Sequence, residues 1–267
     1  MSPGHEQVPK AVPEGDESPT AAYKGAGEAN VSGWELLMSY VHDPKIFSFL
    51  FAILCLGMGM SLVENLLFLL FVQDMGSSNA LCGFSVVVTV AFEIPIFWVG
   101  KRLLERVGPT VLFTIGQLCY VLRAVGYTLC TSGWCVIAFE PLHGVTYGCV
   151  QLASVEYIAT ITSREQLTTG QGIKSAVQTG LGYFLGTLSG GLIIQAFGER
   201  VMYRCAAGLV FIGLGTYLHA RSLPDVPVGG SAGAVKPHAL GKASVPVEEP
   251  ADGFGLPPDE RRPASGG

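Results

Sequence analysis

The sequence predicts an all-α polytopic membrane protein: six transmembrane helices in one bundle, flanked by two disordered tails. Composition is the first reason, because 49% of the 267 residues are hydrophobic and only 14% are charged, against about 25% charged residues in soluble domains. Charge distribution is the second, since fewer than half of the charged residues lie between Ile46 and Ala220. The third is a succession of six apolar runs, each long enough to cross a bilayer.

Four regions follow from this pattern. Residues 1–33 are rich in Pro, Gly, Ala and acidic residues and are predicted to be a disordered cytoplasmic tail. Residues 34–45 contain the amphipathic stretch WELLMSYVH, which is expected at the membrane surface. Residues 46–220 form the transmembrane domain, and residues 221–267 return to the composition of a disordered cytoplasmic tail.

The six predicted spans follow from run length, because an α-helix needs about 20 apolar residues to cross the hydrocarbon core. Pro109 is well placed at the start of the third span, where its missing N–H costs nothing. The predicted spans are residues 46–72, 80–99, 109–129, 134–161, 168–196 and 201–219.

Flanking charge predicts that both termini are cytoplasmic. The flanks at one end of the spans carry six basic residues, whereas those at the other end carry Arg200 alone, or two residues if Arg204 is counted. Basic residues concentrate on the cytoplasmic side, and an even number of spans agrees. The six basic residues are Lys45, Lys101, Arg102, Arg106, Arg164 and Arg221.

Several function classes are not supported by any motif. There is no basic run that indicates nucleic-acid binding, and no zinc-ligand spacing or Gly-rich phosphate loop, so we predict no enzyme, metal or cofactor. The seven cysteines all lie in the apolar region and are typical of small core residues. Cys130 and Cys135 flank one short loop, so their pairing stays open and depends on that loop facing outward.

Ionisable side chains inside the spans are the candidate functional residues, because charge is costly in hydrocarbon. A helix rise of about 1.5 Å per residue places Arg123, Glu140 and His143 at a common depth near or slightly outside mid-membrane. Glu64, followed by Asn65, lies at a similar or slightly outer level. Arg123 can pair with Glu140 or Glu64, while His143 and Glu140 share one helix face at i and i+3.

A second, inner layer of charge is predicted nearer the cytoplasm. Glu93 and Lys174 fall together in the inner third of the membrane, and Lys174 can pair with Glu93 or Glu156. Pro95, two residues after Glu93, marks a kink or gate. For both layers two interpretations stay open: ion pairs that fix helix packing, or groups that act on a solute or proton.

Glycine spacing in the fifth span predicts close helix packing. Gly182, Gly186 and Gly190 recur every four residues and form one small-residue stripe. Such stripes let helix backbones approach closely in lipid, so we interpret them as packing residues in preference to substrate contacts.

Taken together, these motifs resemble the C-terminal half of a major facilitator superfamily transporter, of the MFS_1-like group typified by major facilitator superfamily domain-containing protein 6. The similarity covers about residues 35–220 and implies a six-helix bundle equivalent to one half of that fold. The matching motifs, in order, are Glu64–Leu70, Gly76–Ser85, Glu93–Pro95, Arg123 with Gly126 and Tyr127, Glu140–Tyr147, Thr169–Gly172 and Gly182–Gly198.

The resemblance implies transport of a small polar solute with a proton, as in symporters such as lactose permease and bacterial nucleoside permeases. In those proteins, charged residues on the eighth, ninth and tenth helices bind substrate and transfer protons, and Glu93, Arg123 and His143 occupy the matching helices. Lactose permease has an acid one turn after its histidine. This chain has Thr146 there and places its acid, Glu140, one turn before. The chain departs from the permease in this respect. It is the common depth of Glu140 and His143 and their i, i+3 placement that suggest them as a proton-responsive pair, with Arg123 as the counter-charge.

The stretch VGKRLLERVG is similar to the cytoplasmic gate loop of the superfamily. Glu105, Arg106 and Gly108 fit its pattern, but Gly100 lies one residue too far upstream, so the match is partial. A gate loop and an ordinary basic loop both remain consistent with these residues.

Length separates two functional hypotheses. Full transporters of the superfamily have about twelve spans as paired halves, and this chain has six. It is expected to act as a transporter completed by a homodimer or by a missing amino-terminal half. The alternative is a truncated, non-transporting membrane protein that binds a partner. Either way the partners expected are the lipid bilayer and, for a transporter, a small solute and protons.

Overall fold

A computed structural model describes residues 32–223, and every regular element in that range is helical. The predicted disordered tails therefore lie almost entirely outside the described residues. Two elements, η1 and η3, are π-helices and η2 is a 3₁₀-helix. The elements are α1 (Gly33–His42), α2 (Pro44–Leu69), η1 (Leu70–Asp74), α3 (Asn79–Leu129), α4 (Gly133–Phe139), α5 (Pro141–Ile161), η2 (Arg164–Gln166), α6 (Leu167–Ser175), η3 (Ala176–Gly182), α7 (Tyr183–Phe197) and α8 (Glu199–Ser222).

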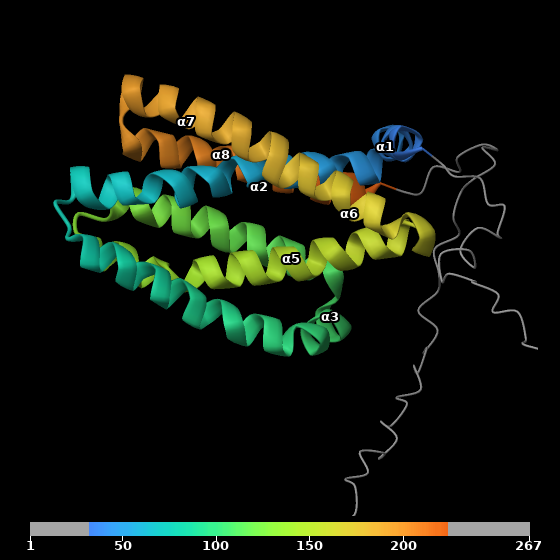
Figure 1. The fold of residues 1–267 in the computed structure, drawn as a ribbon, viewed down its shortest axis with the longest axis horizontal. Coiled ribbons are helices and arrows are strands. Elements are labelled where there is room, and N and C mark those ends of the chain that lie inside the picture. Colours follow the sequence, from blue (N-terminus) through green and yellow to red (C-terminus); the bar gives the residue numbers. More distant parts are fainter. Residues whose placement is uncertain (1–31, 224–267) are drawn as a thin grey trace, which may run out of the picture.

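These elements make the six-helix bundle that the sequence predicts. Four helices are long and apolar enough to cross a membrane: Pro44–Phe68, Asn79–Leu129, Arg164–Phe197 and Glu199–Ser222. The second of these is 51 residues long and folds back on itself, so it supplies two passes (Figure 1). Together, α4 and α5 supply the remaining pass.

The reversal inside α3 occurs at Gly108, whose φ of +77° is strained for any residue with a Cβ. Residues 100–107, expected to be a loop, are instead helical up to that turn. Lys, Arg, Leu and Glu are good helix formers, which accounts for the extension. At Pro95 the backbone dihedrals stay helical, so the helix is not broken there, and the kink stays a prediction.

The fourth predicted span, 134–161, is interrupted instead. Helix α4 ends at Phe139 and α5 begins at Pro141, leaving Glu140 between them as the N-cap residue of α5. Pro141 lacks an N–H, which costs nothing at a first helical position but removes a hydrogen bond within a helix. The break therefore fixes a carboxylate at a helix start.

The loops divide between two ends of the bundle (Figure 1). Helix α1, the Gly108 turn and the α5–α6 turn lie at one end, and the basic flanks belong to it. At this end the Tyr40 hydroxyl hydrogen-bonds the Thr162 hydroxyl and ties α1 to the α5–α6 turn. The opposite end holds the α3–α4 loop and the turn at Gly198.

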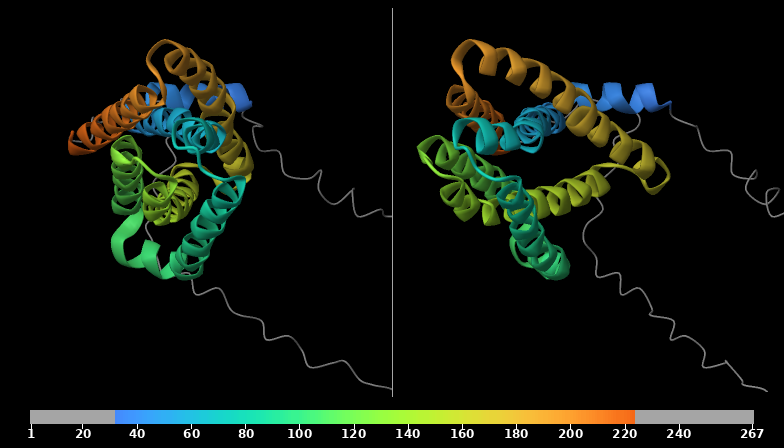
Figure 2. Two further views of the ribbon diagram at one scale, coloured as in Figure 1. Left: turned by 90° about the vertical axis from the view of Figure 1, so that its left-hand side faces the viewer. Right: turned by 60° about the vertical axis from the view of Figure 1, so that its left-hand side comes forward.

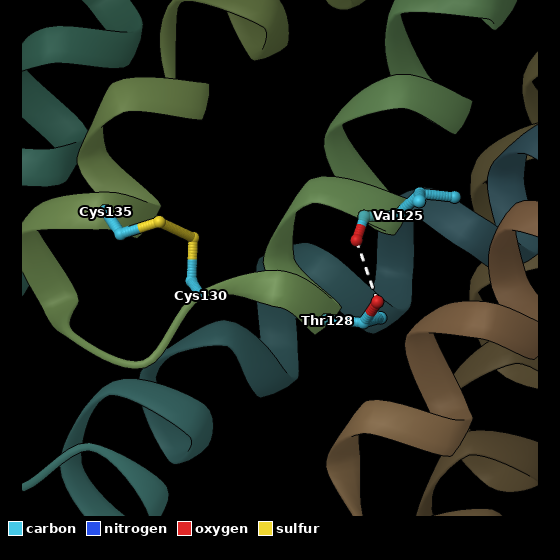
Figure 3. Close-up of a disulfide and its surroundings, with 4 residues drawn as sticks. All are labelled: Val125, Thr128, Cys130 and Cys135. Carbon is cyan, nitrogen blue, oxygen red and sulfur yellow. Dashed lines mark hydrogen bonds between the residues drawn. A yellow bond between two sulfur atoms is a disulfide. The ribbon is translucent and has the colours of Figure 1, made fainter.

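A salt bridge and a disulfide connect segments at that opposite end. Arg200 at the start of α8 pairs with Asp74 at 3.2 Å. Cys130 and Cys135 form a disulfide across the α3–α4 loop, next to the Thr128 hydroxyl, which donates to the Val125 carbonyl at 2.8 Å (Figure 3). This pairing decides the alternative that the sequence left open.

Helix packing places α2 against α7, η3 and α8, while α5 packs chiefly against α3 (Figure 2). The glycine stripe of the fifth pass lies on α2: a Cβ at Gly182 would come within 3.1 Å of the Gly57 Cα. Gly186 and Gly190 are in the same stripe, against Met58 and Leu62. These small residues bring the fifth pass close to α2.

Candidate solute-binding cavity

A cavity of about 380 Å³ opens between α2, α3, α5, η3 and α7. Three of its lining residues are candidates from the sequence, and they come from three different passes of the bundle. The other three are hydroxyl-bearing side chains. The lining residues are Glu64, Glu93, His143, Tyr147, Thr179 and Tyr183.

The two cavity carboxylates come from different helices, α2 and α3. Glu64 lies on α2, and the Tyr183 hydroxyl of α7 donates to its carboxylate at 2.9 Å. Glu93 lies midway between the start of α3 and Gly108. A Cβ at Gly144 would lie 2.7 Å from the Glu93 backbone nitrogen, so this glycine lets α5 approach α3 closely. Glu64 and Glu93 are near enough for their charges to interact.

A polar stripe on α5 continues from the cavity along the bundle. His143, Tyr147 and Gln151 are spaced by four residues and therefore share one face. The His143 and Tyr147 rings are stacked with centroids 6.3 Å apart. The Gln151 carbonyl accepts a hydrogen bond of 2.6 Å from the Lys174 ammonium, which is buried.

Behind the cavity, Glu140 is held in a closed hydrogen-bond network. Its side chain is 3% exposed, and it accepts hydrogen bonds from the Tyr127 hydroxyl at 2.6 Å and the Thr89 hydroxyl at 2.7 Å. The positive end of the α5 dipole also favours a carboxylate at this position. Glu140 is thus stabilised by both passes of α3 and by α5, without an ion pair among the described residues.

Arg123 is the least expected feature of this region. It is fully buried, and none of its three guanidinium nitrogens has a hydrogen-bond partner within the described chain. Its guanidinium carbon lies 5.8 Å from the Tyr120 ring centroid and 5.6 Å from that of Tyr127. Tyrosine faces thus surround the guanidinium group, and cation–π attraction offsets part of its desolvation.

The predicted ion pairs do not form among the described residues. Arg123 reaches Glu64 and His143 only through its electric field, and the rings of Tyr120 and Tyr127 lie beside it. The Lys174 ammonium donates a hydrogen bond to the Gln151 carbonyl, and Glu93 lines the same cavity as Glu64. Glu93 lines the cavity with Glu64 and His143 and so does not form the predicted pair with Lys174, while its depth in the membrane stays a prediction.

The remaining candidates lie away from the cavity lining. The Asn65 amide donates to the Thr187 hydroxyl at 3.1 Å. Gly100 packs against Leu152, and Glu105 and Arg106 are exposed beside the Gly108 turn. These last residues are therefore at the end of the bundle opposite to the disulfide.

Sequence reasoning missed the hydroxyl groups of the site. Tyr147 could have been found, because it continues the four-residue spacing from His143. Tyr183 bonds a residue 119 positions away, so no local pattern could reveal it. Thr179 lies on η3, and π-helical turns of this kind occur frequently at functional sites.

The bundle and its open polar cavity define a multi-pass α-helical membrane protein with one half of the major facilitator fold. Residues 6–205 match the family described as the MFS_1 like family, and the chain belongs to that family. The resemblance expected from the motifs is thus confirmed.

Relatives of known name are similar over part of their length. The mouse protein named major facilitator superfamily domain-containing protein 6-like is 26% identical over 188 residues, which is 69% of this chain and 31% of the mouse protein. Its human counterpart is 27% identical over 177 residues, 64% of this chain and 30% of that protein. A maltose permease of Geobacillus stearothermophilus is 24% identical over 145 residues, 54% of this chain and 37% of the permease. The chain spans about a third of the length of these relatives.

Proposed function

We propose that this bundle is a secondary transporter, or one half of one, that moves a small polar solute together with a proton. The observation that carries the proposal is the cavity itself. Its volume of about 380 Å³ suits a small solute. Ionisable groups from three passes line it, and such groups in membrane-spanning helices are retained at a cost in stability.

The proton-responsive pair in this proposal is Glu140 and His143. His143 lines the cavity, and its backbone N–H bonds the Glu140 carbonyl one turn before it at 2.9 Å. Protonation of Glu140 removes a negative charge from the network around Tyr127 and Arg123. The change in charge alters which helix arrangement is favoured, and a proton can thereby bias alternating access.

Both termini are proposed to be cytoplasmic. Two features support this orientation: the basic flanks gather at the end that carries α1, and the Cys130–Cys135 disulfide lies at the other end. Disulfides persist on the oxidising side of a membrane. Glycosylation tags at Ser77 and Ser132 are expected to be modified and tags in either tail are not, whereas modified tails contradict the orientation.

In this proposal the cavity is completed by a second copy of the chain or by an amino-terminal half. The first half of α3 supports it, since large apolar side chains there face outward: Val87 is 62%, Ile94 64% and Trp98 89% exposed. Lipid covers part of that surface. The same exposure favours the second candidate function, a non-transporting membrane protein that binds a partner through this face.

Reconstitution tests the two functions against each other. The chain is placed in liposomes containing a pH-sensitive dye, and maltose, uridine and choline are added in turn. Proton movement and counterflow exchange with at least one solute, absent from empty liposomes, are expected of the transporter. Neither proton movement nor exchange, from a chain that purifies as a stable monomer, contradicts transport and favours partner binding.

A further inference from the structure

We propose that the solute of this cavity carries a positively charged nitrogen, as in a small primary or quaternary ammonium compound. This inference rests on the proposed function, because it takes the cavity to be the solute site. It adds the charge of the solute, which the family description does not give.

The charge balance of the cavity lining is the first argument. Glu64 and Glu93 both line it and are close enough to repel each other. Neither of them forms an ion pair within residues 32–223: Glu64 accepts a hydrogen bond from the neutral Tyr183 hydroxyl, and Arg123 acts on it only through its electric field. A bound cation removes this repulsion.

The neighbouring cations leave the two carboxylates available. Arg123 lies outside the cavity lining, among tyrosine rings, and donates no hydrogen bond to Glu64 or Glu93. The Lys174 ammonium is bonded to Gln151, toward the other end of the stripe. Counting Glu140 outside the cavity lining, this part of the bundle holds three carboxyl groups and one guanidinium group.

The uncharged lining supports the same class of solute. Tyr147 and Tyr183 supply aromatic groups, and the faces of tyrosine rings attract ammonium and quaternary ammonium groups. The Thr179 hydroxyl and the His143 ring can accept a hydrogen bond from a solute hydroxyl or amine. An anionic solute is disfavoured because it would meet two carboxylates. A neutral solute is disfavoured because it would leave both of them without a counter-charge.

Choline and its neutral carbon isostere, 3,3-dimethyl-1-butanol, provide a direct test. They have nearly the same shape and differ in charge, and the quaternary nitrogen of choline has no proton to exchange with a carboxylate. Binding of each is measured with the 267-residue chain in lipid nanodiscs, with empty nanodiscs as the blank. Saturable choline binding at least about tenfold tighter than that of the isostere is expected.

Two variants locate the binding. Glu64→Gln and Glu93→Gln are each expected to weaken choline binding about tenfold, because each removes one charge that faces the nitrogen. Glu156→Gln is the matched control: it removes a carboxylate from α5 outside the cavity lining, and choline binding is expected to stay unchanged. Gel filtration and circular dichroism establish folding, and the comparison of choline with its isostere decides the issue even if a variant misfolds.

Equal binding of the isostere, or choline binding no tighter than to empty nanodiscs, overturns the inference. So does full choline binding by both cavity variants. If choline fails while maltose or uridine still exchanges across liposomes, the assignment of charge is wrong and the proposed transport stands. If no solute exchanges although choline binds as described, transport is wrong and the cation site stands.

Discussion

Carboxylates on neighbouring helices of this bundle differ in their exposure and in their hydrogen bonds. Glu140 is 3% exposed, and both of its oxygens accept hydrogen bonds from buried hydroxyls. Glu64 and Glu93 open into the cavity, and of these two only Glu64 receives a side-chain hydrogen bond. A carboxylate in a membrane domain can therefore be stabilised by fixed protein dipoles, or it can remain free to bind a mobile cation. The first arrangement holds the charge in place within the protein, and the second leaves a charge available to bind a solute.

His143 belongs to both regions. Its backbone bonds Glu140 and its ring lines the cavity beside Tyr147. A buried ring nitrogen, Nδ1, has no hydrogen-bond partner within the described helices. A change in the Glu140 network can thus reach the cavity through one turn of α5.

The largest effect is expected from Arg123→Met, which removes the positive charge that lies between the two regions. Proton-driven uptake should fall at least about a hundredfold, because a counter-charge in such a site is worth several kcal/mol. The melting temperature should stay the same or rise, since an apolar residue of similar size avoids the cost of burying an unpaired charge. Uptake in liposomes and thermal unfolding check the two parts. A large loss of stability with transport retained would show that Arg123 serves the fold.

Cys130→Ser combined with Cys135→Ser tests whether the hydrogen-bond network around Glu140 depends on the disulfide beside it. The disulfide closes the loop between the helix of Tyr127 and the helix that leads to Glu140. Its loss is expected to lower the unfolding free energy by about 2 kcal/mol, the value for so short a loop. Thermal unfolding of the double variant, with reduced wild-type protein as the comparison, measures this. Unchanged stability in both would contradict a role for the cross-link.

A matched pair of tyrosine variants compares the two regions with one chemical change. Tyr127→Phe leaves buried Glu140 with one hydroxyl donor fewer and should cost about 1–3 kcal/mol of stability. Tyr183→Phe removes the donor to Glu64, which solvent can replace, and should cost less than about 0.5 kcal/mol. Denaturant titration of both variants gives the difference. Equal costs would mean that the two carboxylates are not distinct in environment.

Much of the bundle could be predicted from the sequence, because hydrophobic run length and small-residue spacing are local properties. The six passes and the close packing of the Gly182 stripe follow from such patterns. Three cavity residues, Glu64, Glu93 and His143, could be named because charge in an apolar run is conspicuous.

Partners across the bundle could not be predicted, for physical reasons. The Tyr183 hydroxyl donates a hydrogen bond to Glu64. The hydroxyls of Thr89 and Tyr127 donate to Glu140. Each contact depends on the packing of segments distant in sequence. Complementary charge suggested ion pairs for Arg123, but tyrosine rings fill the space beside it. Glu93 lines the cavity with Glu64 and His143 through packing of α3 against α5, which no local pattern reveals.

The measurement that tests the central claim most directly compares Glu140→Gln with Glu64→Gln in proteoliposomes, using whichever solute the wild type exchanges. One assay records uphill accumulation driven by a proton gradient alone, and the other records solute exchange without a gradient. Glu140→Gln is expected to abolish accumulation and to leave exchange largely intact, whereas Glu64→Gln should weaken both because solute binding is impaired. If Glu140→Gln still concentrates the solute, Glu140 is not the coupling site, and the functional division between the closed network and the cavity is wrong.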